Sequence, residues 1–360
     1  MLGIGLDSLM RHDESEVEVL RTEYPALDRI IGGFYPEEFV ILGGRPGCGK
    51  STLAMNFAQY TALKFKRAAA IFSMELSTKR LAERNLASLA RVDLESLKAN
   101  RLDDDDLQRV CSAAKQCIQA PLFFDTTPTL TTASLYSKIT ALREEHDVAL
   151  AVVDYPHLMR TTDDTRSEAE RLAEISRDLK AISKELRMTV LALSPLNRSP
   201  LLRVDGRPQI SDLRGSGSLE DDADTILLLH RPDRGDARSA EIIVGKQRHG
   251  SEGSVKLRFF GEYARFDPCP ADCISDARPN AREADEEKSP INEVYINQAL
   301  GFGFSQDEMQ ALLAESGLVI KVGKAWEPTG HAKQFLHPKP EKGRIWRRDV
   351  IEYLRTSRGL

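Results

Sequence analysis

The sequence predicts an α/β fold in which a mainly parallel sheet is covered by helices. Short apolar runs alternate with long amphipathic stretches from about residue 26 to residue 267, and this alternation is typical of a parallel sheet with helical crossovers. Several runs are apolar at every position, as expected of strands buried on both faces. Residues 168–186 carry apolar side chains at spacings of three and four, which predicts an amphipathic helix.

Seven short apolar runs that lie between longer helical stretches are interpreted as strands. The predicted strands are residues 39–42, 68–72, 122–124, 148–153, 189–193, 225–229 and 241–244.

A phosphate-binding motif follows the first strand. Residues 44–51 read GRPGCGKS, which fits G-x-x-x-x-G-K-[ST] between an apolar strand and a helical stretch over 52–63. The glycines let backbone N–H groups face phosphates, and the helix N-terminus adds its positive end. The motif predicts ATP as ligand, with Lys50 on the β- and γ-phosphates and Ser51 on Mg²⁺. The predicted nucleotide-binding residues are Gly44, Arg45, Pro46, Gly47, Cys48, Gly49, Lys50, Ser51, Thr52 and Asp154.

Two carboxylates stand at strand ends. Glu75 lies just after the strand over 68–72, and Asp154 ends the strand over 148–153. The carboxyl ends of parallel strands face the ligand, so Glu75 is the candidate for orienting and deprotonating an attacking water. Asp154 is, with Ser51, the candidate Mg²⁺ ligand. An exposed acid at a strand end is the alternative interpretation of each.

Composition excludes several classes of protein. The chain has 360 residues, 41% hydrophobic, with a formal net charge of −5, so any nucleic-acid contact must come from a local basic surface. No run of 18 apolar residues predicts a membrane span, and the first 20 residues do not resemble a signal peptide. The five cysteines are scattered and odd in number, which favours reduced thiols in a cytoplasmic protein.

Four segments are predicted along the chain. Residues 1–20 are a short docking segment or a frayed terminus, and residues 21–269 are the nucleotide-binding domain. Residues 270–290 are rich in Pro, Ala, Asp and Glu, which is typical of a linker. Residues 291–360 regain apolar spacing and predict a small α+β module similar to a winged helix, with helices near 293–300, 305–316 and 348–354, a strand at 318–322 and a turn at 326–329.

The last part of this module is basic. Residues 319–360 hold ten Lys and Arg but four Asp and Glu, and Trp326, Phe335 and Trp346 are interleaved with them. A wing that binds DNA or a partner protein is one interpretation. A small core built on the two tryptophans, with a solvated basic face, is the other.

Taken in order, the motifs of residues 20–267 resemble the ATPase domain of DnaB-type replicative helicases. The segments that carry the resemblance are TEYPALD (22–28), FSMELS (72–77), VVDYPHLM (152–159), EISRDLKA (174–181), LSPLNR (193–198), SDLRGSGSLE (211–220) and KQRHG (246–250).

The resemblance implies a RecA-like fold and an ATP-dependent helicase, usually a homo-hexamer that encircles single-stranded DNA and moves 5′ to 3′. Nucleotide would lie between subunits, and Arg248 with Lys246 would reach the γ-phosphate of the neighbour's ATP. The residues that match a DNA-contacting loop are Arg214, Gly215, Ser216 and Gly217, and Arg198 and Arg203 are further candidates. A helicase loader or replication initiator is the implied partner.

Four departures from the family pattern keep other functions open. Pro195 stands where the family has Gln, His157 stands where it often has Gln, and Gly215 replaces an acid. The family's N-terminal helical domain has no counterpart in this sequence, which favours a phage, plasmid or other mobile-element replication protein. A RecA-fold DNA-binding ATPase that is not a helicase, such as a loader or recombination mediator, is the alternative. A regulator with a vestigial ATPase is a third, which the presence of Lys50, Glu75, Asp154 and Arg248 disfavours.

Overall fold

The computed structural model describes residues 19–161, 166–197, 199–203, 205–232, 237–248 and 250–269, together with four short strands further along the chain. The chain divides into two compact units, Met1–Asp276 and Ala277–Leu360. Within the described residues, no helix has the length and apolar character needed to cross a membrane. The predicted segment 1–20, apart from its last two residues, and the predicted linker, apart from its last residue, lie outside the described residues, and so does Arg198.

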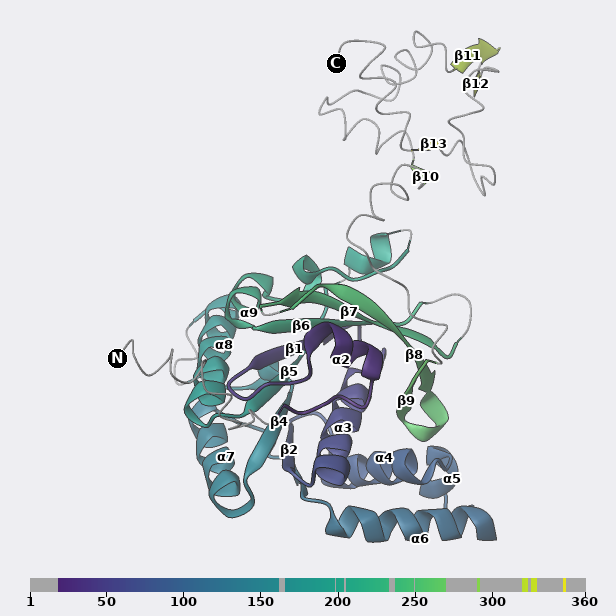
Figure 1. The fold of residues 1–360 in the computed structure, drawn as a ribbon. Coiled ribbons are helices and arrows are strands. Elements are labelled where there is room, and N and C mark those ends of the chain that lie inside the picture. Colours follow the sequence, from purple (N-terminus) through teal and green to yellow (C-terminus); the bar gives the residue numbers. More distant parts are fainter. Residues whose placement is uncertain are drawn as a thin grey trace, which may run out of the picture. The chain divides into compact units, whose positions relative to one another are not determined.

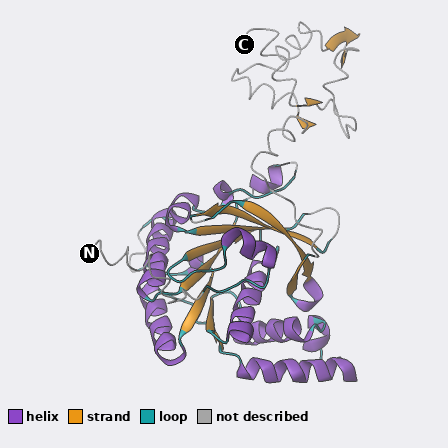
Figure 2. Ribbon diagram, in the orientation of Figure 1, coloured by secondary structure: helices purple, strands orange, loops and turns teal. Residues whose placement is uncertain are grey.

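A nine-stranded sheet forms the centre of the first unit, with helices around it (Figures 1 and 2). Its strand order is β3-β2-β4-β5-β1-β6-β7-β8-β9. The strands from β3 to β6 run parallel, and β7, β8 and β9 are added antiparallel at one edge. The strands are β1 (Phe39–Gly44), β2 (Ala68–Ser73), β3 (Leu122–Asp125), β4 (Val148–Asp154), β5 (Thr189–Pro195), β6 (Thr225–His230), β7 (Ser239–Gln247), β8 (Gly253–Phe260) and β9 (Arg265–Pro268).

Helices cover both faces of this sheet (Figure 1). Val40 and Leu42 of β1 join one core with Leu53 and Phe57 of α3. Phe39 and Ile41 join a second core with α7 and α8, because successive strand residues point to opposite faces. The helices of the first unit are α2 (Pro25–Ile31), α3 (Lys50–Tyr60), α4 (Thr78–Ala90), α5 (Leu94–Lys98), α6 (Asp104–Gln119), α7 (Thr132–His146), α8 (Glu168–Glu185) and α9 (Ser216–Asp222).

All seven predicted strands are confirmed, each extended by one to five residues. The strands β8 and β9 were not predicted. In β8 the buried Val255 and Leu257 alternate with the exposed Lys256 and Arg258. This alternation is typical of a strand covered on one face only, and it lacks the continuous apolar run that marks the central strands.

The predicted helix over 168–186 is α8, and its start is fixed by a capping box. Ser167 accepts from the backbone N–H of Glu170, and the Glu170 carboxylate accepts from the backbone N–H of Ser167. The predicted helix over 52–63 begins earlier, at Lys50, and is followed by a π-helical turn at Thr61–Phe65. Lys66 ends that turn in the left-handed conformation with φ of 56°.

The second unit is described only at four short strands, β10 (Pro290–Ile291), β11 (Val319–Val322), β12 (Ala325–Pro328) and β13 (Trp346–Arg347). The strand predicted at 318–322 is confirmed as β11. The turn predicted at Trp326 is wrong for residues 326–328, because Trp326 lies in β12 and pairs with Lys321. The three helices predicted in this unit lie outside the described residues.

Candidate functional site

A cleft of about 420 Å³ lies where the carboxyl ends of β1, β2, β4 and β5 meet. The parallel strands bring the ends of segments far apart in sequence to one edge of the sheet. The cleft therefore gathers most of the predicted phosphate loop and the predicted Glu75 and Asp154, together with Pro195. The lining residues are Pro46, Gly47, Gly49, Lys50, Ser51, Thr52, Glu75, Leu76, Arg84, Leu94, Asp154, Tyr155, Pro195, Phe259, Gly261 and Ala264.

The phosphate loop adopts a conformation that requires glycine. Gly47 and Gly49 have φ of 77° and 103°, and a Cβ on Gly49 would stand 2.9 Å from the ring of Phe266. The Nζ of Lys50 donates to the carbonyls of Gly44 (2.8 Å) and Arg45 (3.1 Å). These bonds hold the ammonium over the loop, where it can meet an anion that also accepts from backbone N–H groups.

Ser51 and Asp154 form the candidate cation-binding pair. Asp154 ends β4, is 3% exposed and accepts a hydrogen bond from Ser51. Burial raises the pKa of Asp154, the Ser51 hydrogen bond and the charge of Lys50 lower it, and the nearby Glu75 raises it. A divalent cation would relieve this penalty, because it stabilises the ionised carboxylate.

Glu75 lies at the mouth of the cleft on a turn that two hydrogen bonds define. The N–H of Met74 donates to the carbonyl of Asp154 over 2.9 Å, and the N–H of Leu76 donates to Ser73 Oγ over 3.1 Å. The exposed carboxylate of Glu75 is therefore carried by a backbone anchored to the cation-binding strand. This position suits a general base that must reach a water molecule.

Other residues of the predicted loop lie beside the cleft or under it. Cys48 is 8% exposed, and a Cβ on Gly44 would stand 2.7 Å from its Sγ. The backbone N–H of Cys48 donates to the carbonyl of Arg45 over 3.2 Å. Gly44, Arg45 and Cys48 thus shape the loop from below.

Sequence reasoning missed one wall of the cleft. Phe259, Gly261 and Ala264 line it from the β8–β9 hairpin, and Arg84 lines it from α4. Phe259 packs against Phe266 with ring centroids 4.6 Å apart. Neither phenylalanine belongs to one of the sequence motifs, so only the strand pairing of β8 and β9 reveals that they reach the phosphate loop.

Arg248 and Lys246 lie at the opposite end of the parallel strands from the cleft, beside the start of β6. The guanidinium of Arg248 is 3.3 Å from Asp224 Oδ1 and donates to the Asp221 carbonyl over 3.1 Å. The Nζ of Lys246 donates to the carbonyl of Glu220.

The sheet register measures the separation from the phosphate loop. The N–H of Asp224 donates to the carbonyl of Phe39, where β1 begins, whereas the phosphate loop follows the other end of β1 at Gly44. At about 3.3 Å per strand residue the two edges are roughly 15 Å apart. The two basic side chains are therefore not brought to the cleft of their own chain.

The backbone of Arg214 connects the cleft to the predicted DNA loop. Its N–H donates to the carbonyl of Pro195 over 3.2 Å, and its carbonyl is 3.2 Å from Nε2 of His157. Burial lowers the pKa of His157, and its hydrogen bond to Arg214 raises it. The Arg214 side chain is 59% exposed and pairs with Glu168 at 2.9 Å.

The rest of the predicted DNA loop is shaped by Gly215. This residue has φ of 74°, where a side chain strains the backbone, and a Cβ on it would stand 2.3 Å from Cδ2 of Leu172, which would have to move. Ser216 begins α9, and a Cβ on Gly217 would meet no atom within 4 Å outside the backbone of its own helix. Arg203 is bound by both terminal nitrogens to the buried Asp212, at 2.5 and 2.9 Å, which is a structural role.

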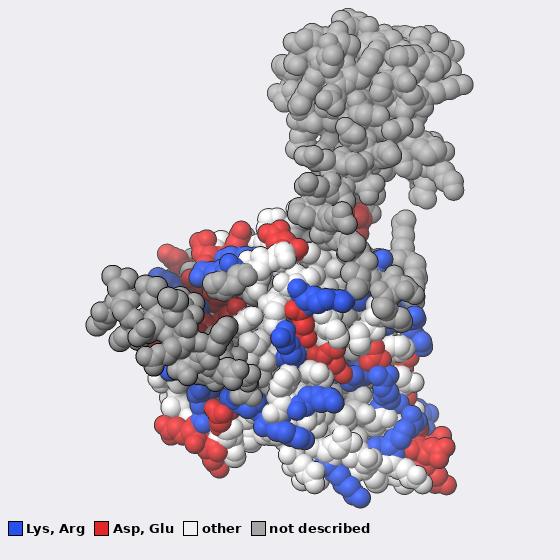
Figure 3. Space-filling model, in the orientation of Figure 1, with Lys and Arg blue, Asp and Glu red and all other residues white. Residues whose placement is uncertain are grey.

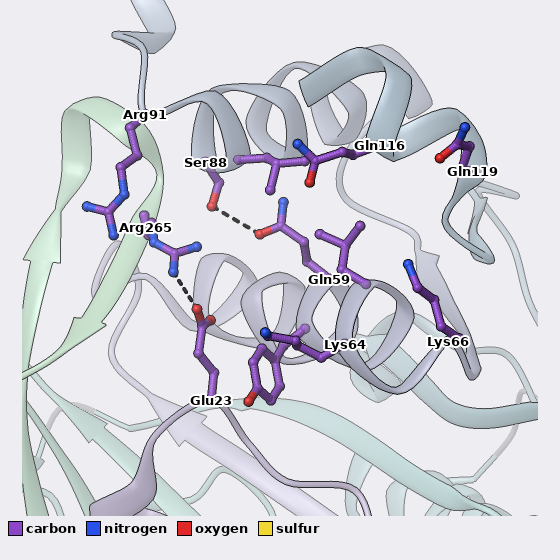
Figure 4. Close-up of a pocket in the computed structure, with 12 residues that line it drawn as sticks. Glu23, Gln59, Lys64, Lys66, Ser88, Arg91, Gln116, Gln119 and Arg265 are labelled. Carbon is purple, nitrogen blue, oxygen red and sulfur yellow. Dashed lines mark hydrogen bonds and ion pairs between the residues drawn. The ribbon is translucent and has the colours of Figure 1, made fainter. Parts of the chain in front are cut away.

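A second cleft of about 400 Å³ lies between α3 and α4 and the strand β9 (Figure 4). Arg265 pairs there with Glu23 and Asp267, and Arg91 also pairs with Asp267. These internal carboxylates neutralise the two guanidinium groups. The cleft at the phosphate loop, with its glycine cradle and its lysine, is therefore the candidate nucleotide site.

Comparison with known proteins agrees with this geometry. The family model "DnaB-like helicase C terminal domain" matches residues 19–268. The replicative DNA helicase DnaB of Leifsonia xyli subsp. xyli is 35% identical over 261 residues, covering 71% of this chain and 57% of its own length. That of Pasteurella multocida is 40% identical over 254 residues, covering 68% and 54%. The chain spans little more than half the length of these relatives.

Solved structures are similar over the same part of the chain. One solved ATPase domain aligns with a TM-score of 0.69 at 26% identity, covering 74% of this chain and 97% of that one. A DnaB-like replicative helicase, solved in a study of its interactions with primase, aligns with a TM-score of 0.69 at 27% identity, covering 74% and 66%. The fold is therefore the RecA-like α/β fold that the motifs predicted. Because the family model spans residues 19–268 and the order of strands and motifs agrees with it, this chain belongs to the DnaB-like helicase C-terminal domain family.

Proposed function

We propose that this protein is an ATP-dependent DNA helicase that hydrolyses ATP at the cleft and translocates 5′ to 3′ on single-stranded DNA during replication. The observation that carries the proposal is the split of the catalytic groups between two edges of one sheet. Lys50, Ser51, Glu75 and Asp154 share one edge, whereas Arg248 and Lys246 lie at the other. A homo-hexameric ring joins these edges by bringing Arg248 of one subunit to the ATP of the next.

The chemistry follows from the roles of these groups. Lys50 and the loop N–H groups bind the β- and γ-phosphates, and Glu75 orients and deprotonates the attacking water. Arg248, with Lys246, stabilises the charge that spreads over the transferred phosphoryl group. Because that charge is met by a neighbouring subunit, each hydrolysis event depends on subunit contact.

Mg²⁺ is the expected metal, with Ser51 and Asp154 as its protein ligands. Within the part of the chain that the structure describes, no group of three or more His, Cys, Asp or Glu side chains could hold a metal ion by itself. A cation that takes its remaining ligands from phosphate oxygens and water fits such a sparse donor set. When bound, it neutralises charge on the phosphates.

DNA contact is assigned to the loop at Arg214, Gly215, Ser216 and Gly217, with Arg198 as a further candidate. On the face shown in Figure 3, Lys and Arg side chains of the described residues are interspersed with Asp and Glu, so these residues form no uniformly basic surface on that face. Arg214 is exposed, and its exposed partner Glu168 holds it only weakly. A phosphate of single-stranded DNA can therefore replace that carboxylate.

The organisation of the chain completes the proposal. Residues 21–269 form the ATPase domain, residues 270–290 a linker and residues 291–360 a winged-helix-like module, with a docking segment at 1–20. A helicase loader or replication initiator is the expected partner, and the cytoplasm is the expected location. Origin in a phage, plasmid or other mobile element stays a prediction.

A RecA-fold ATPase that binds DNA without unwinding it is the second candidate, favoured by Pro195. This residue lines the ATP cleft and has no side-chain hydrogen-bonding group that could respond to a phosphate. Its carbonyl, which accepts from the N–H of Arg214, is the group of Pro195 that contacts the proposed DNA loop.

One experiment separates the two candidates. The full chain is assayed for ATP hydrolysis and for unwinding of forked duplexes with a 5′ or a 3′ loading strand, and its mass is measured with and without nucleotide. A helicase forms a ring, is stimulated by single-stranded DNA and unwinds only the fork with a 5′ loading strand. DNA-stimulated hydrolysis without unwinding of any fork would support the second candidate.

A further inference from the structure

A buried ionic junction lies at the sheet edge that carries Arg248. Asp224 precedes β6 and is 4% exposed. Its Oδ2 accepts from the backbone N–H of Phe39 (2.8 Å) and from the Nζ of Lys180 in α8 (2.5 Å). Its Oδ1 is 3.3 Å from the guanidinium of Arg248. One carboxylate thus joins β1, α8 and the end of β7.

The main chain adds a second link between Asp224 and Arg248. The N–H of Arg248 donates to the carbonyl of Asp224 over 3.0 Å. Arg248 is therefore held at its backbone and at its side chain by one residue. The Arg248 side chain is still 43% exposed, so its remaining N–H groups can reach an anion on another subunit.

The charge balance of the junction depends on Asp224. Lys180 is 15% exposed at its side chain, and its Nζ also donates to the carbonyl of Glu37. If Asp224 became neutral, the mostly buried ammonium and the guanidinium would lose the one carboxylate charge that both of them contact. The more exposed of the two cations, Arg248, would then turn away.

We infer that Asp224 is the positioning residue that presents Arg248 to the ATP of the neighbouring subunit. The inference rests on the proposed function, since it assumes that Arg248 acts across a subunit interface. Asp224 itself lies level with Phe39 at the start of β1, so it does not touch nucleotide bound in its own chain. Its loss should therefore impair the neighbour's hydrolysis and spare the binding of ATP to its own phosphate loop.

The test uses Asp224→Asn, which keeps the size of the side chain and an oxygen for the N–H of Phe39. The expected result is a fall in kcat for ATP of about 10-fold or more, since an arginine that acts across an interface can contribute roughly 10³-fold or more. The KM for ATP should stay within about twofold, because the cleft of each subunit is unchanged. Glu37→Gln, at the neighbouring exposed acid, is the control for general effects at this edge.

Mixing subunits distinguishes positioning from a structural defect. Lys50→Ala subunits are inactive but carry an intact Arg248 and Asp224. When they are mixed with Asp224→Asn subunits, some interfaces pair an intact phosphate loop with an intact Arg248, so activity should rise above that of either variant alone. Absence of any rise would overturn the inference, because it would mean that Asp224→Asn damages its own cleft.

A mixture of Arg248→Ala and Lys50→Ala subunits distinguishes a failure of the proposed function from a failure of the role assigned to Asp224. If this pair also fails to recover activity, the cross-subunit site of the proposed function is wrong. If it recovers while the Asp224→Asn pair does not, only the role of Asp224 is wrong.

If Asp224→Asn does not assemble, the double variant Asp224→Asn with Lys180→Met replaces it in the same mixing assay. This change removes the stranded ammonium and still leaves Arg248 without its carboxylate. Failure of the double variant to assemble would also count against the inference, since Asp224 would then be a determinant of the fold.

Discussion

The backbone N–H of Arg214 donates to the carbonyl of Pro195, so the proposed DNA loop is hydrogen-bonded directly to a residue that lines the ATP cleft. The carbonyl of Arg214 meets His157, three residues beyond Asp154. The loop is thus joined to the end of β5 by a backbone hydrogen bond and to the segment after β4 by the His157 side chain. These contacts offer a route between nucleotide and DNA that needs no polar side chain at position 195.

His157 should influence this route through a single hydrogen bond. His157→Ala is expected to weaken the stimulation of ATP hydrolysis by single-stranded DNA by about threefold to tenfold, the equivalent of one hydrogen bond of roughly 1 kcal/mol. His157→Gln, which keeps a side-chain donor, should recover most of it. The measurement is the ratio of hydrolysis rates with and without DNA. Equal ratios in the two variants would show that the Arg214 contact carries no coupling.

Lys50 should be essential for turnover. Lys50→Ala is expected to lower kcat/KM for ATP by about 100-fold or more, because a preorganised charge on the transferred phosphoryl group is lost. Lys64→Ala is the matched control, since Lys64 lines the second cleft, whose arginines are already paired. If the Lys64 variant loses as much activity as the Lys50 variant, the nucleotide site has been assigned to the wrong cleft.

Gly215 should be required for stability. Gly215→Ala places a Cβ against Leu172 at a left-handed backbone position, and it is expected to lower the free energy of unfolding by about 2–4 kcal/mol. Gly217→Ala, where a Cβ meets open space within α9, should range from neutral to about 1 kcal/mol stabilising. Denaturant unfolding of both variants checks this, and equal stability of the two would contradict the described loop.

Glu38 should make stability depend on pH. Burial raises the pKa of Glu38 to about 7 from an ordinary value of 4.5; the Tyr35 N–H lowers it, the charge of Asp224 raises it and that of Lys180 lowers it. The folded protein therefore holds a proton that the unfolded chain releases, and its contribution to stability is lost as pH rises from about 4.5 through 7.

Glu38→Gln removes this titration. Its unfolding free energy should fall less than that of the parent between about pH 5 and pH 8, by about 2 kcal/mol after allowance for solvent screening. Glu37→Gln, at an exposed side chain, should keep the parental pH dependence. Parallel pH profiles for the parent and Glu38→Gln would be inconsistent with a buried, protonated Glu38.

The parts of the site that the sequence predicted are those fixed by local rules. The GRPGCGKS motif needs only a strand before it and a helix after it, and Glu75 and Asp154 needed only the rule that parallel strands end together. The residues that were missed depend on distant pairing. Phe259 reaches the cleft because β8 and β9 pair at the sheet edge. Arg203, a DNA candidate in the sequence, is instead bound to Asp212.

The charged residues around Arg248, beside the starts of β1 and β6, follow no local sequence rule. Arg248 could be named from the resemblance, but nothing in its surrounding sequence identified Asp224 and Lys180 as its neighbours. They meet because β1, β6 and α8 place residues 39, 180 and 224 together. Such a junction follows from tertiary packing and leaves no periodic pattern in the sequence.

The most direct test of the central claim is a structure of the assembled protein with a non-hydrolysable ATP analogue and single-stranded DNA. The account predicts a closed ring in which the γ-phosphate held by Lys50 of one subunit lies within hydrogen-bonding distance of Arg248 from the next. A ring, or any other assembly, in which that guanidinium stays at Asp224 far from every bound nucleotide would contradict it.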